Sequence, residues 1–449
     1  MRDLSRLVRA DGCSPGAPRP LGIEEILVGR DAVSSLPTSC TKVVASGRAG
    51  PTRVAVLCDG NTRRVAGPLV EKSLAPVCAA PGFCELVSPA EDGGDLIPDE
   101  RTIGMALTAA APDADLLVSL GAGTITDVAR YVAYRIGRPL VAVATAPSVD
   151  GFTSAVSSLL LQGVKTTIPA AAPLAVIADS SIMAAAPRRL IRAGIGDLVG
   201  KLISRLDWSL SGIVNDEKMC DYIIELVAGY VERILALEEG ATSSLAGVET
   251  LFEGLAVSGL GMTLMGNSRP ASGAEHHIAH LLDMQQALGN VPRLYHGECV
   301  AVGAYVMSIL YHQLASRSLA EVAAARGTAS RMEEERISVI RRQFGALADV
   351  LLRRLLASRH EPPSRSSIMR NLESGWERLQ TLVRESLPGP SALSAALRRM
   401  KVPHDPRELG IPPEILRAAL LCTRTISSRY TLLAFLDEIG LLEEEVAST

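Results

Sequence analysis

Aromatic residues are scarce in this sequence: only 3% of its 449 residues are Phe, Trp or Tyr. Because 47% of the residues are hydrophobic, the cores must be built mainly from Ala, Val, Leu and Ile. No apolar run reaches the ~18 residues that a transmembrane helix needs, and the N-terminus lacks the apolar segment of a secretory signal. We therefore expect no membrane partner.

Strong charge of one sign and closely paired cysteines are also missing. The formal net charge is −4 and no strongly basic block occurs, which argues against nucleic acid as a partner. The eight cysteines are scattered, without a CxxC pair. In a chain of this length, that pattern predicts reduced thiols in a cytoplasmic protein.

Continuous apolar segments alternate with helical patterns in the first part of the chain. Five of these segments predict buried strands: 23–29, 53–59, 114–120, 140–144 and 174–179. Such alternation predicts a parallel sheet that is covered on both faces.

After about residue 187 the strand signals end, and apolar residues recur at helical spacing. A chain of 449 residues is also too long for one simple core. We expect an N-terminal arm at 1–20, an α/β domain at 21–186 and an all-helical domain at 187–449.

Four of the seven histidines fall in the short span 276–296. His276 and His280 are four residues apart, so on a helix they share one face, whereas His277 points elsewhere. His296 follows a break at 289–292. Two histidines from one element and a third from the next can converge on a divalent metal. A capped helix with surface histidines would have the same spacing, so spacing alone leaves both interpretations open.

Asp197 lies in the glycine-rich, otherwise apolar segment 194–201. An ionised carboxylate in such a setting needs a partner, because an unpaired buried charge is costly. A metal would supply that partner, and Asp197 with His276 and His296 would form an open three-ligand site. Zinc accepts this ligand set, and other divalent metals also fit. The alternative is a helix N-cap after a glycine turn.

A glycine-rich turn, Gly121 to Thr124, lies between a predicted strand and a predicted helix. Glycine lets the backbone approach an anion closely, and a helix N-terminus offers free N–H groups, so this turn predicts a phosphate cradle. The spacing is not GxGxxG, so the usual Rossmann fingerprint is absent. An ordinary tight turn, with Asp127 in the first helical turn, is the alternative.

Polar residues follow two other predicted strands. Asp59 stands where an acidic side chain can hold adenosine ribose hydroxyls, or it caps the next helix. Parallel sheets place ligands at the carboxyl ends of their strands. Four polar side chains follow the strand at 140–144: Thr145, Ser148, Asp150 and Ser154. The alternative interpretation of this segment is an ordinary turn.

In their order and spacing, six segments resemble the sn-glycerol-1-phosphate dehydrogenases, in particular their bacterial long-form branch. This family lies within the group of glycerol dehydrogenases and dehydroquinate synthases. The segments are 121–131 (GAGTITDVARY), 145–156 (TAPSVDGFTSAV), 165–179 (KTTIPAAAPLAVIAD), 193–201 (AGIGDLVGK), 266–280 (GNSRPASGAEHHIAH) and 296–303 (HGECVAVG). The APSVDG and GNSRPASGAEHH segments are specific to this family.

The resemblance implies a dehydroquinate synthase-like fold, in which an α/β dinucleotide-binding domain precedes an all-helical metal and substrate domain. It implies that Asp197, His276 and His296 are the metal ligands. The implied dinucleotide contacts are Asp59, Gly121, Ala122, Gly123, Thr124, Ile125, Asp127, Thr145, Ser148 and Ser154. The implied substrate contacts are Asp150, Asp197 and His280. Lys165 and Arg269 are candidates for the substrate phosphate, with ordinary surface charge as the alternative.

The implied reaction is metal-dependent hydride transfer between NAD(H) or NADP(H) and dihydroxyacetone phosphate, which yields sn-glycerol 1-phosphate for phospholipid metabolism. We expect one divalent metal per chain, zinc first and nickel or iron as alternatives, and His280 as the proton relay. The protein is expected to be a cytoplasmic homo-oligomer, dimeric or larger. The alternatives are a dehydroquinate synthase-like lyase, a dehydrogenase of another polyol phosphate, and a non-enzymatic regulatory protein.

Overall fold

The computed structural model describes residues 1–5, 22–44, 53–78, 80–88, 95–110, 114–238, 240–325, 329–357 and 365–447. The chain forms two compact units: unit 1 holds Met1–Leu198 and Glu225–Ser268, and unit 2 holds Val199–Ile224 and Arg269–Thr449. This division differs from the predicted boundary at 187. Unit 1 keeps the later helix α9 (Leu245–Met265) because that helix packs against α5 (Ser180–Ala184) and the 3-10 turn η2 (Asp150–Thr153).

Unit 1 is built on a seven-stranded sheet in the order β1-β2-β9-β6-β5-β3-β4. All its pairings are parallel except that of β1 with β2. The strands are β1 (Arg2–Asp3), β2 (Glu25–Gly29), β3 (Val54–Asp59), β4 (Gly82–Leu86), β5 (Leu116–Gly121), β6 (Leu140–Ala144) and β9 (Ala175–Asp179). The predicted parallel sheet is confirmed.

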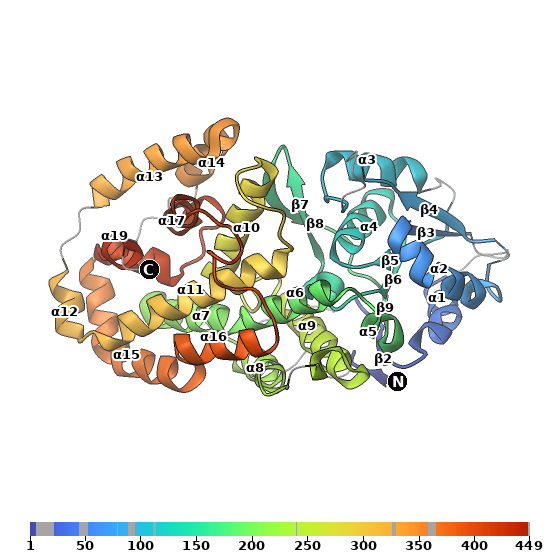
Figure 1. Ribbon diagram of the computed structural model, residues 1–449, viewed down its shortest axis with the longest axis horizontal. Coiled ribbons are helices and arrows are strands. Elements are labelled where there is room, and N and C mark those ends of the chain that lie inside the picture. The colour runs from blue at the N-terminus through green and yellow to red at the C-terminus, as the bar shows by residue number, and fades with distance from the viewer. Residues whose placement is uncertain are drawn as a thin grey trace. The chain divides into compact units, whose positions relative to one another are not determined.

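Helices cover both faces of the sheet, as Figure 1 shows. Alternate residues of β3 enter opposite cores: Val56 packs in one and Leu57 in the other. One core contains Val70 of α2, and the other contains Val128 of α4. The helices on these faces are α1 (Leu36–Val44), α2 (Gly60–Leu74), α3 (Glu100–Ala109) and α4 (Gly123–Ile136).

An antiparallel hairpin in unit 1 was not predicted. It joins β7 (Val156–Leu161) to β8 (Val164–Pro169) through Gln162 and Gly163. Both turn residues have positive φ, of 52° and 75°, as a tight two-residue hairpin turn requires. The apolar and polar residues of 156–169 alternate only in part, which explains why the pattern did not predict two strands.

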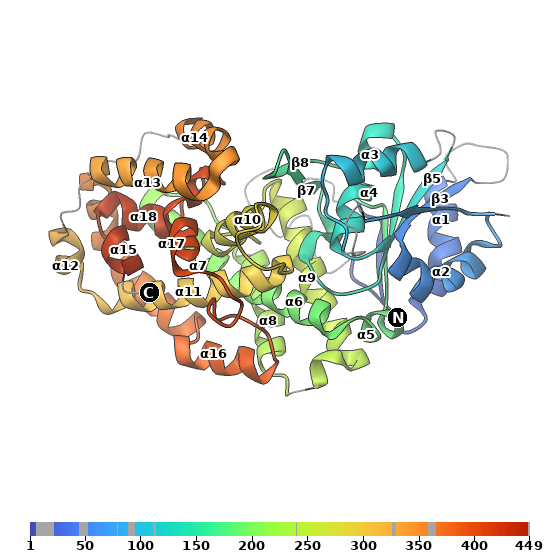
Figure 2. The same ribbon diagram turned by 45° about the horizontal axis from the view of Figure 1, so that its top comes forward.

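The described residues of unit 2 form helices joined by loops, without a strand, as predicted. Its central pair is α10 (Ala274–Ala287) and α11 (His296–Ser316), and α10 also packs against α7 (Lys201–Asn215) and α17 (Pro413–Leu421). Figure 2 shows α17 between α10 and the outer helices of this unit. The remaining helices of 8 or more residues are α13 (Ala329–Phe344), α14 (Ala348–Ala357), α15 (Arg365–Ser386), α16 (Pro390–Arg399) and α18 (Leu432–Ile439).

Four other helices complete the described residues of the two units. They are α6 (Arg188–Val199), α8 (Asp221–Leu235), α12 (Leu319–Ala324) and α19 (Leu442–Ala447). Of the predicted N-terminal arm, residues 2 and 3 form an edge strand, and residues 6–20 lie outside the described part of the chain.

Two helices, α9 and α11, are long and apolar enough to cross a membrane by length and composition. The most apolar windows of these helices are 78% and 67% buried inside the protein, as in core helices of a folded domain. Glycine and alanine in α11 allow this burial: a Cβ on Gly303 would lie 2.5 Å from the carbonyl oxygen of Glu275 in α10. The two helices of the central pair therefore approach each other closely.

The prediction of reduced thiols is confirmed for six cysteines and is wrong for Cys220. Cys40, Cys58, Cys78, Cys84, Cys299 and Cys422 are free. Cys220 is disulfide-bonded. Cys13 lies outside the described residues.

Candidate functional site

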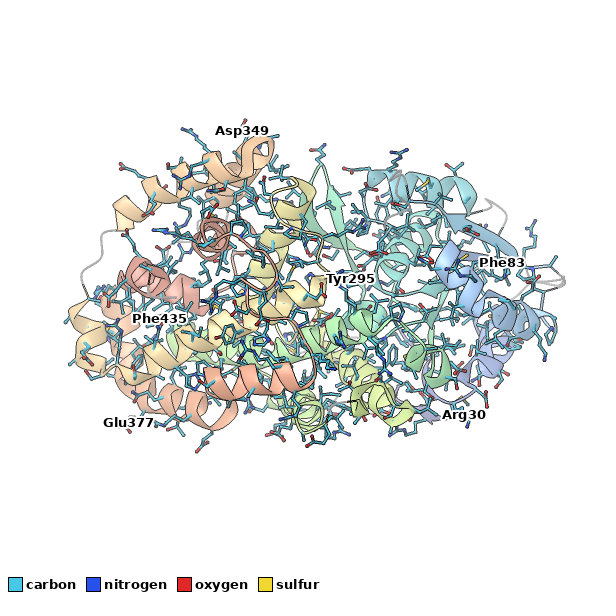
Figure 3. The ribbon with its side chains drawn as sticks, viewed as in Figure 1. Arg30, Phe83, Tyr295, Asp349, Glu377 and Phe435 are labelled. Carbon is cyan, nitrogen blue, oxygen red and sulfur yellow. The ribbon has the colours of Figure 1, made fainter. Side chains whose placement is uncertain are left out.

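Three of the predicted histidines cluster in unit 2. His276 and His280 lie on α10, and His296 is the first residue of α11, directly after Tyr295, which Figure 3 labels. The ring centroids of His276 and His296 are 5.5 Å apart, and those of His280 and His296 are 5.1 Å apart in a stacked arrangement. The structure thus brings the three side chains together.

The two successive histidines, His276 and His277, are buried, with 6% and 2% of their surface exposed. The alternative of a helix with surface histidines is therefore wrong for both. Burial lowers the pKa of His277 well below its usual value, and Arg429 adds to this effect. His277 is thus held neutral at physiological pH.

An acidic residue that was not predicted joins the histidine cluster. Ligand atoms of His280, Asp283 and His296 lie within 4.8 Å of one another, close enough to hold a metal ion. Asp283 is three residues after His280, a spacing that also places two residues on one face of a helix, so the sequence could have indicated it. This arrangement brings together the imidazole and carboxylate donors that zinc and similar metals accept.

Asp197, the third predicted ligand, belongs to unit 1 and lies inside α6. It is buried, with 1% of its surface exposed, and its position within the helix argues against the N-cap alternative. One carboxylate oxygen accepts a hydrogen bond of 2.9 Å from the backbone N–H of Asp150. Since Asp197 and the histidines lie in different units, the three-ligand set remains a prediction.

Asp150 is the second carboxylate of this region. Its side chain accepts a hydrogen bond of 3.0 Å from the hydroxyl of Ser258 on α9, a residue that was not predicted. Gly259 lets α9 approach, because a Cβ there would lie 2.5 Å from the Asp150 carbonyl oxygen. Unit 1 therefore holds Asp150 and Asp197 side by side.

The glycine-rich turn follows β5 and leads into α4, as predicted. A Cβ on Gly123 would lie 2.9 Å from the side chain of Val149, and one on Gly121 would overlap Ile125. Both glycines are thus required by close packing, whereas Ala122 is the N-cap residue and tolerates its methyl group. The free N–H groups at the start of α4 are suited to a phosphate.

The polar loop after β6 lies beside this turn, because the backbone N–H of Thr145 donates to the Gly121 carbonyl at 3.1 Å. Thr145, Ser148 and Ser154 are all buried. The carboxylate of Asp127, also predicted to contact the cofactor, pairs with Arg130. Asp127 therefore has a structural partner within unit 1.

Asp59 is the N-cap of α2. Its side chain accepts a hydrogen bond of 2.8 Å from the Thr62 N–H, and the Thr62 hydroxyl accepts one from the Asp59 N–H. The cap alternative is therefore realised, and contact with the cofactor ribose remains a prediction.

The two cations proposed for the substrate phosphate differ in their surroundings. Lys165 lies on β8. Arg269 is buried and donates to Glu217, at 2.7 Å, and to the carbonyl oxygen of Tyr430. These contacts engage its guanidinium inside unit 2 and do not favour a role in phosphate binding. A different buried cation, Lys201, lies 3.5 Å from Nε2 of His276 and was not predicted.

Comparison with known proteins identifies the family of the chain. A glycerol-1-phosphate dehydrogenase (NAD(P)+) of Bacillus licheniformis is 31% identical to this chain over 98% of the chain and 96% of the relative. The chain belongs to the glycerol-1-phosphate dehydrogenase family. A relative of the same name from Geobacillus stearothermophilus is also 31% identical, over 99% of each chain.

Residues 28–187 also match the family model for iron-containing alcohol dehydrogenase. Solved structures with 14–17% identity share the fold of this family member. They include glycerol dehydrogenase of Schizosaccharomyces pombe, with a TM-score of 0.58 over 94% of this chain and 89% of that one. Alcohol dehydrogenase of Oenococcus oeni has a TM-score of 0.60, over 94% and 97%. The predicted fold class is confirmed.

Proposed function

We propose that this member of the glycerol-1-phosphate dehydrogenase family interconverts dihydroxyacetone phosphate and sn-glycerol 1-phosphate with NAD(H) or NADP(H) and one divalent metal. The observation that carries the proposal is the near-complete match to relatives that bear this enzyme name. The histidine cluster supports it, because it offers the donors that a catalytic metal needs.

The residues of each unit fit the groups that the reaction requires. In unit 2, imidazole nitrogens of His276 and His296 would bind the metal, and the carboxylate of Asp197 from unit 1 would add negative charge. Zinc comes first among the candidates, with nickel or iron as alternatives. When bound, such a metal polarises a carbonyl group and stabilises negative charge on its oxygen.

Unit 1 supplies the proposed cofactor contacts. The backbone N–H groups around Gly121 and Gly123 would hold the pyrophosphate at the start of α4. Thr145, Ser148 and Ser154 follow β6 and would line the rest of the dinucleotide. A nicotinamide supplies the hydride, and these residues fix its orientation.

Asp150, Asp197 and His280 are the proposed substrate contacts. The hydrogen bond from Ser258 restricts the orientation of the Asp150 side chain, whose carboxylate would accept a hydrogen bond from a substrate hydroxyl. His280 lies one helical turn from His276 and would pass a proton to the product oxygen. Lys165 remains the candidate for the phosphate.

The direct test is oxidation of NADH and NADPH with dihydroxyacetone phosphate, in metal-free protein and after addition of Zn²⁺, Ni²⁺ or Fe²⁺. A chiral assay of the product must give sn-glycerol 1-phosphate and not the 3-phosphate. Elemental analysis should find about one divalent ion per chain. Full activity in metal-free protein, or the 3-phosphate as product, would contradict the proposal.

Related activities are separated by the same assay. Turnover with another polyol phosphate at higher kcat/KM would identify a different dehydrogenase, and a dehydroquinate synthase-type reaction would leave no net oxidised cofactor. We also propose a cytoplasmic homo-oligomer, dimeric or larger. Light scattering of the purified protein would contradict that assembly if it gave the mass of one chain, 47.4 kDa.

A further inference from the structure

Two carboxylates of α10 contact the histidines that are proposed as metal ligands. Glu275 Oε1 lies 2.7 Å from Nδ1 of His276, and Asp283 Oδ2 lies 3.1 Å from Nδ1 of His296. In both pairs the carboxylate takes the Nδ1 side of the ring. The two ligands thus share one arrangement, although they come from different helices.

The surroundings of His276 define which ring nitrogen carries the proton. A carboxylate accepts hydrogen bonds only, and the ammonium of a lysine donates only. Glu275 faces Nδ1, and Nζ of Lys201 lies 3.5 Å from Nε2. A neutral His276 between these two groups therefore carries its proton on Nδ1 and keeps the lone pair on Nε2.

Asp283 makes the corresponding contact with His296. The 3.1 Å distance to His296 is within hydrogen-bonding range, whereas the 3.6 Å distance from the same oxygen to Nδ1 of His280 exceeds it. The contact of Asp283 is therefore mainly with His296, and it directs the lone pair of His296 to Nε2. His280, stacked on His296, does not receive the same support from this carboxylate.

Glu275 is fixed tightly enough to orient a neighbour. It is fully buried, and its Oε1 also accepts a hydrogen bond of 2.9 Å from the Gly273 N–H. A Cβ on Gly273 would lie 2.7 Å from Oε2 of Glu275 and 2.5 Å from Oδ2 of Asp207. The absence of a side chain at Gly273 thus makes room for both carboxylates.

We propose that Glu275 and Asp283 are positioning residues that hold His276 and His296 as Nδ1–H tautomers, with both Nε2 atoms directed to one divalent metal. A carboxylate on the far nitrogen fixes the orientation of a ligating imidazole and raises its basicity. This inference rests on the proposed function only in the identity of the group that Nε2 binds.

The first test needs no metal and no activity. In metal-free wild-type protein labelled with ¹⁵N-histidine, two-bond ¹H–¹⁵N spectra distinguish the two neutral tautomers, and substitution of single histidines assigns the signals. The expected result is protonated Nδ1 for both His276 and His296. A proton on Nε2 of either ring would overturn the assignment of its carboxylate, whether or not the enzyme reduces dihydroxyacetone phosphate.

The second test measures metal affinity, with a chromophoric chelator as competitor for Zn²⁺. Glu275→Leu and Asp283→Ala should each weaken binding by about 10- to 100-fold, the usual effect of removing such a partner. Glu275→Gln should lose less than about 10-fold, because its amide oxygen can still accept from Nδ1–H. Equal losses for Glu275→Gln and Glu275→Leu, or unchanged affinity in Glu275→Leu, would overturn the role of Glu275.

Two further measurements of Zn²⁺ affinity test the role of Asp283 and provide a control variant. No measurable Zn²⁺ binding by folded Asp283→Ala would make Asp283 a direct ligand and overturn its positioning role. Asp437→Asn removes another buried carboxylate of unit 2, which pairs with Arg336 at 2.9 Å. Its Zn²⁺ affinity should stay within about twofold of wild type, and a loss equal to that of Glu275→Leu would show that destabilisation alone causes the effect. If a variant does not fold, the tautomer measurement still decides the proposal.

Discussion

The two units position their functional side chains by different means. In unit 1, polar residues follow the carboxyl ends of strands, and backbone groups and closely packed glycines fix them, as at Gly121 and Thr145. In unit 2, histidines project from helices, and neighbouring carboxylates fix them, as Glu275 fixes His276. The comparison teaches that the same enzyme fixes the turn at Gly121 by close packing in unit 1 and fixes His276 by a polar contact in unit 2.

This difference predicts that substitutions in the two units will have different effects. A side chain added to a closely packed glycine of unit 1 must displace its neighbours, so the expected damage is steric. A carboxylate removed from beside the histidines of unit 2 should change what these histidines can bind. The variants below test this contrast, from the largest expected effect to the smallest.

The largest effect on turnover is expected when a proposed metal ligand is replaced. His276→Ala and His296→Ala should lose metal and turnover together, because two ligands do not hold the ion. His280→Ala should keep its metal and slow turnover by ~10²–10⁴-fold, the usual contribution of a positioned acid or base. The measurement is metal content beside steady-state kinetics.

His277→Ala is the control within the same helix, and its effect on catalysis should be much smaller. Because His280 also lies within metal-binding distance of His296, the roles of His276 and His280 could be exchanged. Loss of metal from His280→Ala, with metal retained by His276→Ala, would establish that exchange.

In unit 1, Gly194→Ala is expected to destabilise the protein through a steric clash. A Cβ at this position of α6 would overlap the backbone carbonyl of Pro147, in the loop that carries Asp150. Overpacking against backbone should cost about 3 kcal/mol of unfolding free energy. Chemical denaturation measures the change.

Gly229→Ala is the matched control, since Gly229 lies in α8 and a Cβ there would meet nothing within 4 Å. It should raise the free energy of unfolding by about 0.5–1 kcal/mol, because alanine favours a helix over glycine. If both variants lost equal stability, close packing at Gly194 would not be the cause.

The sequence predicted the sheet of unit 1 well, because short continuous apolar segments bounded by turn residues are typical of buried parallel strands. Those of β3, β5 and β6 were recognised, and their carboxyl ends gave the place of the polar loops. The hairpin β7–β8 was missed, since its strands do not alternate clearly. The unit boundary also differed, because the helical pattern of α9 does not reveal that it packs on the α/β unit.

The sequence predicted the histidines of the candidate site, but it did not predict the polar residues that contact them. Spacing placed His276 and His280 on one face, and the structure places both beside His296. Ser258 and Lys201 were missed, because no local pattern shows which polar residue of a helix faces a distant side chain. Asp283 was missed although its spacing from His280 could have indicated it. For Arg269, the positive charge alone gave no sign of the buried pairing with Glu217, and its role at the substrate phosphate stays a prediction.

Unit 2 should also show a pH-dependent stability that comes from its buried carboxylates. Burial, and then the nearby charge of Glu275, raises the pKa of Asp207 to about 6, from an ordinary value of 3.8. The folded state therefore binds more protons than the unfolded state between these values, and this contribution to stability falls as the pH rises from about 4 to 6. The slope should not exceed about 1.4 kcal/mol per pH unit.

Denaturation of wild type and Asp207→Asn across this pH range checks the assignment. The variant loses part of the hydrogen bonding to Tyr311 and Ala274, so its stability is lower throughout. Its curve should nevertheless be flatter between pH 4 and 6. Parallel curves for the two proteins would mean that Asp207 does not titrate in this window.

The smallest effect is expected at Asp59, where unit 1 combines a structural and a proposed binding role. Its carboxylate should repel the 2′-phosphate of NADP(H) and hydrogen-bond the ribose hydroxyls of NAD(H). Since a partly exposed charge contributes only ~0.2–1 kcal/mol, Asp59→Ala should shift the ratio of kcat/KM values toward NADP(H) by about 1.4- to fivefold. Steady-state kinetics with both cofactors measures the ratio.

Loss of the helix cap could mimic this effect, and Asp99→Ala separates the two causes. Asp99 caps α3 of the same unit, and its side chain accepts a hydrogen bond of 2.9 Å from the Thr102 N–H, just as Asp59 accepts one of 2.8 Å from Thr62. Both variants should lose about 1 kcal/mol of stability. Only Asp59→Ala should change the cofactor ratio, because only Asp59 lies at the carboxyl end of β3, at the predicted ribose position. An equal shift in both variants would remove Asp59 from the binding site and leave it as a cap alone.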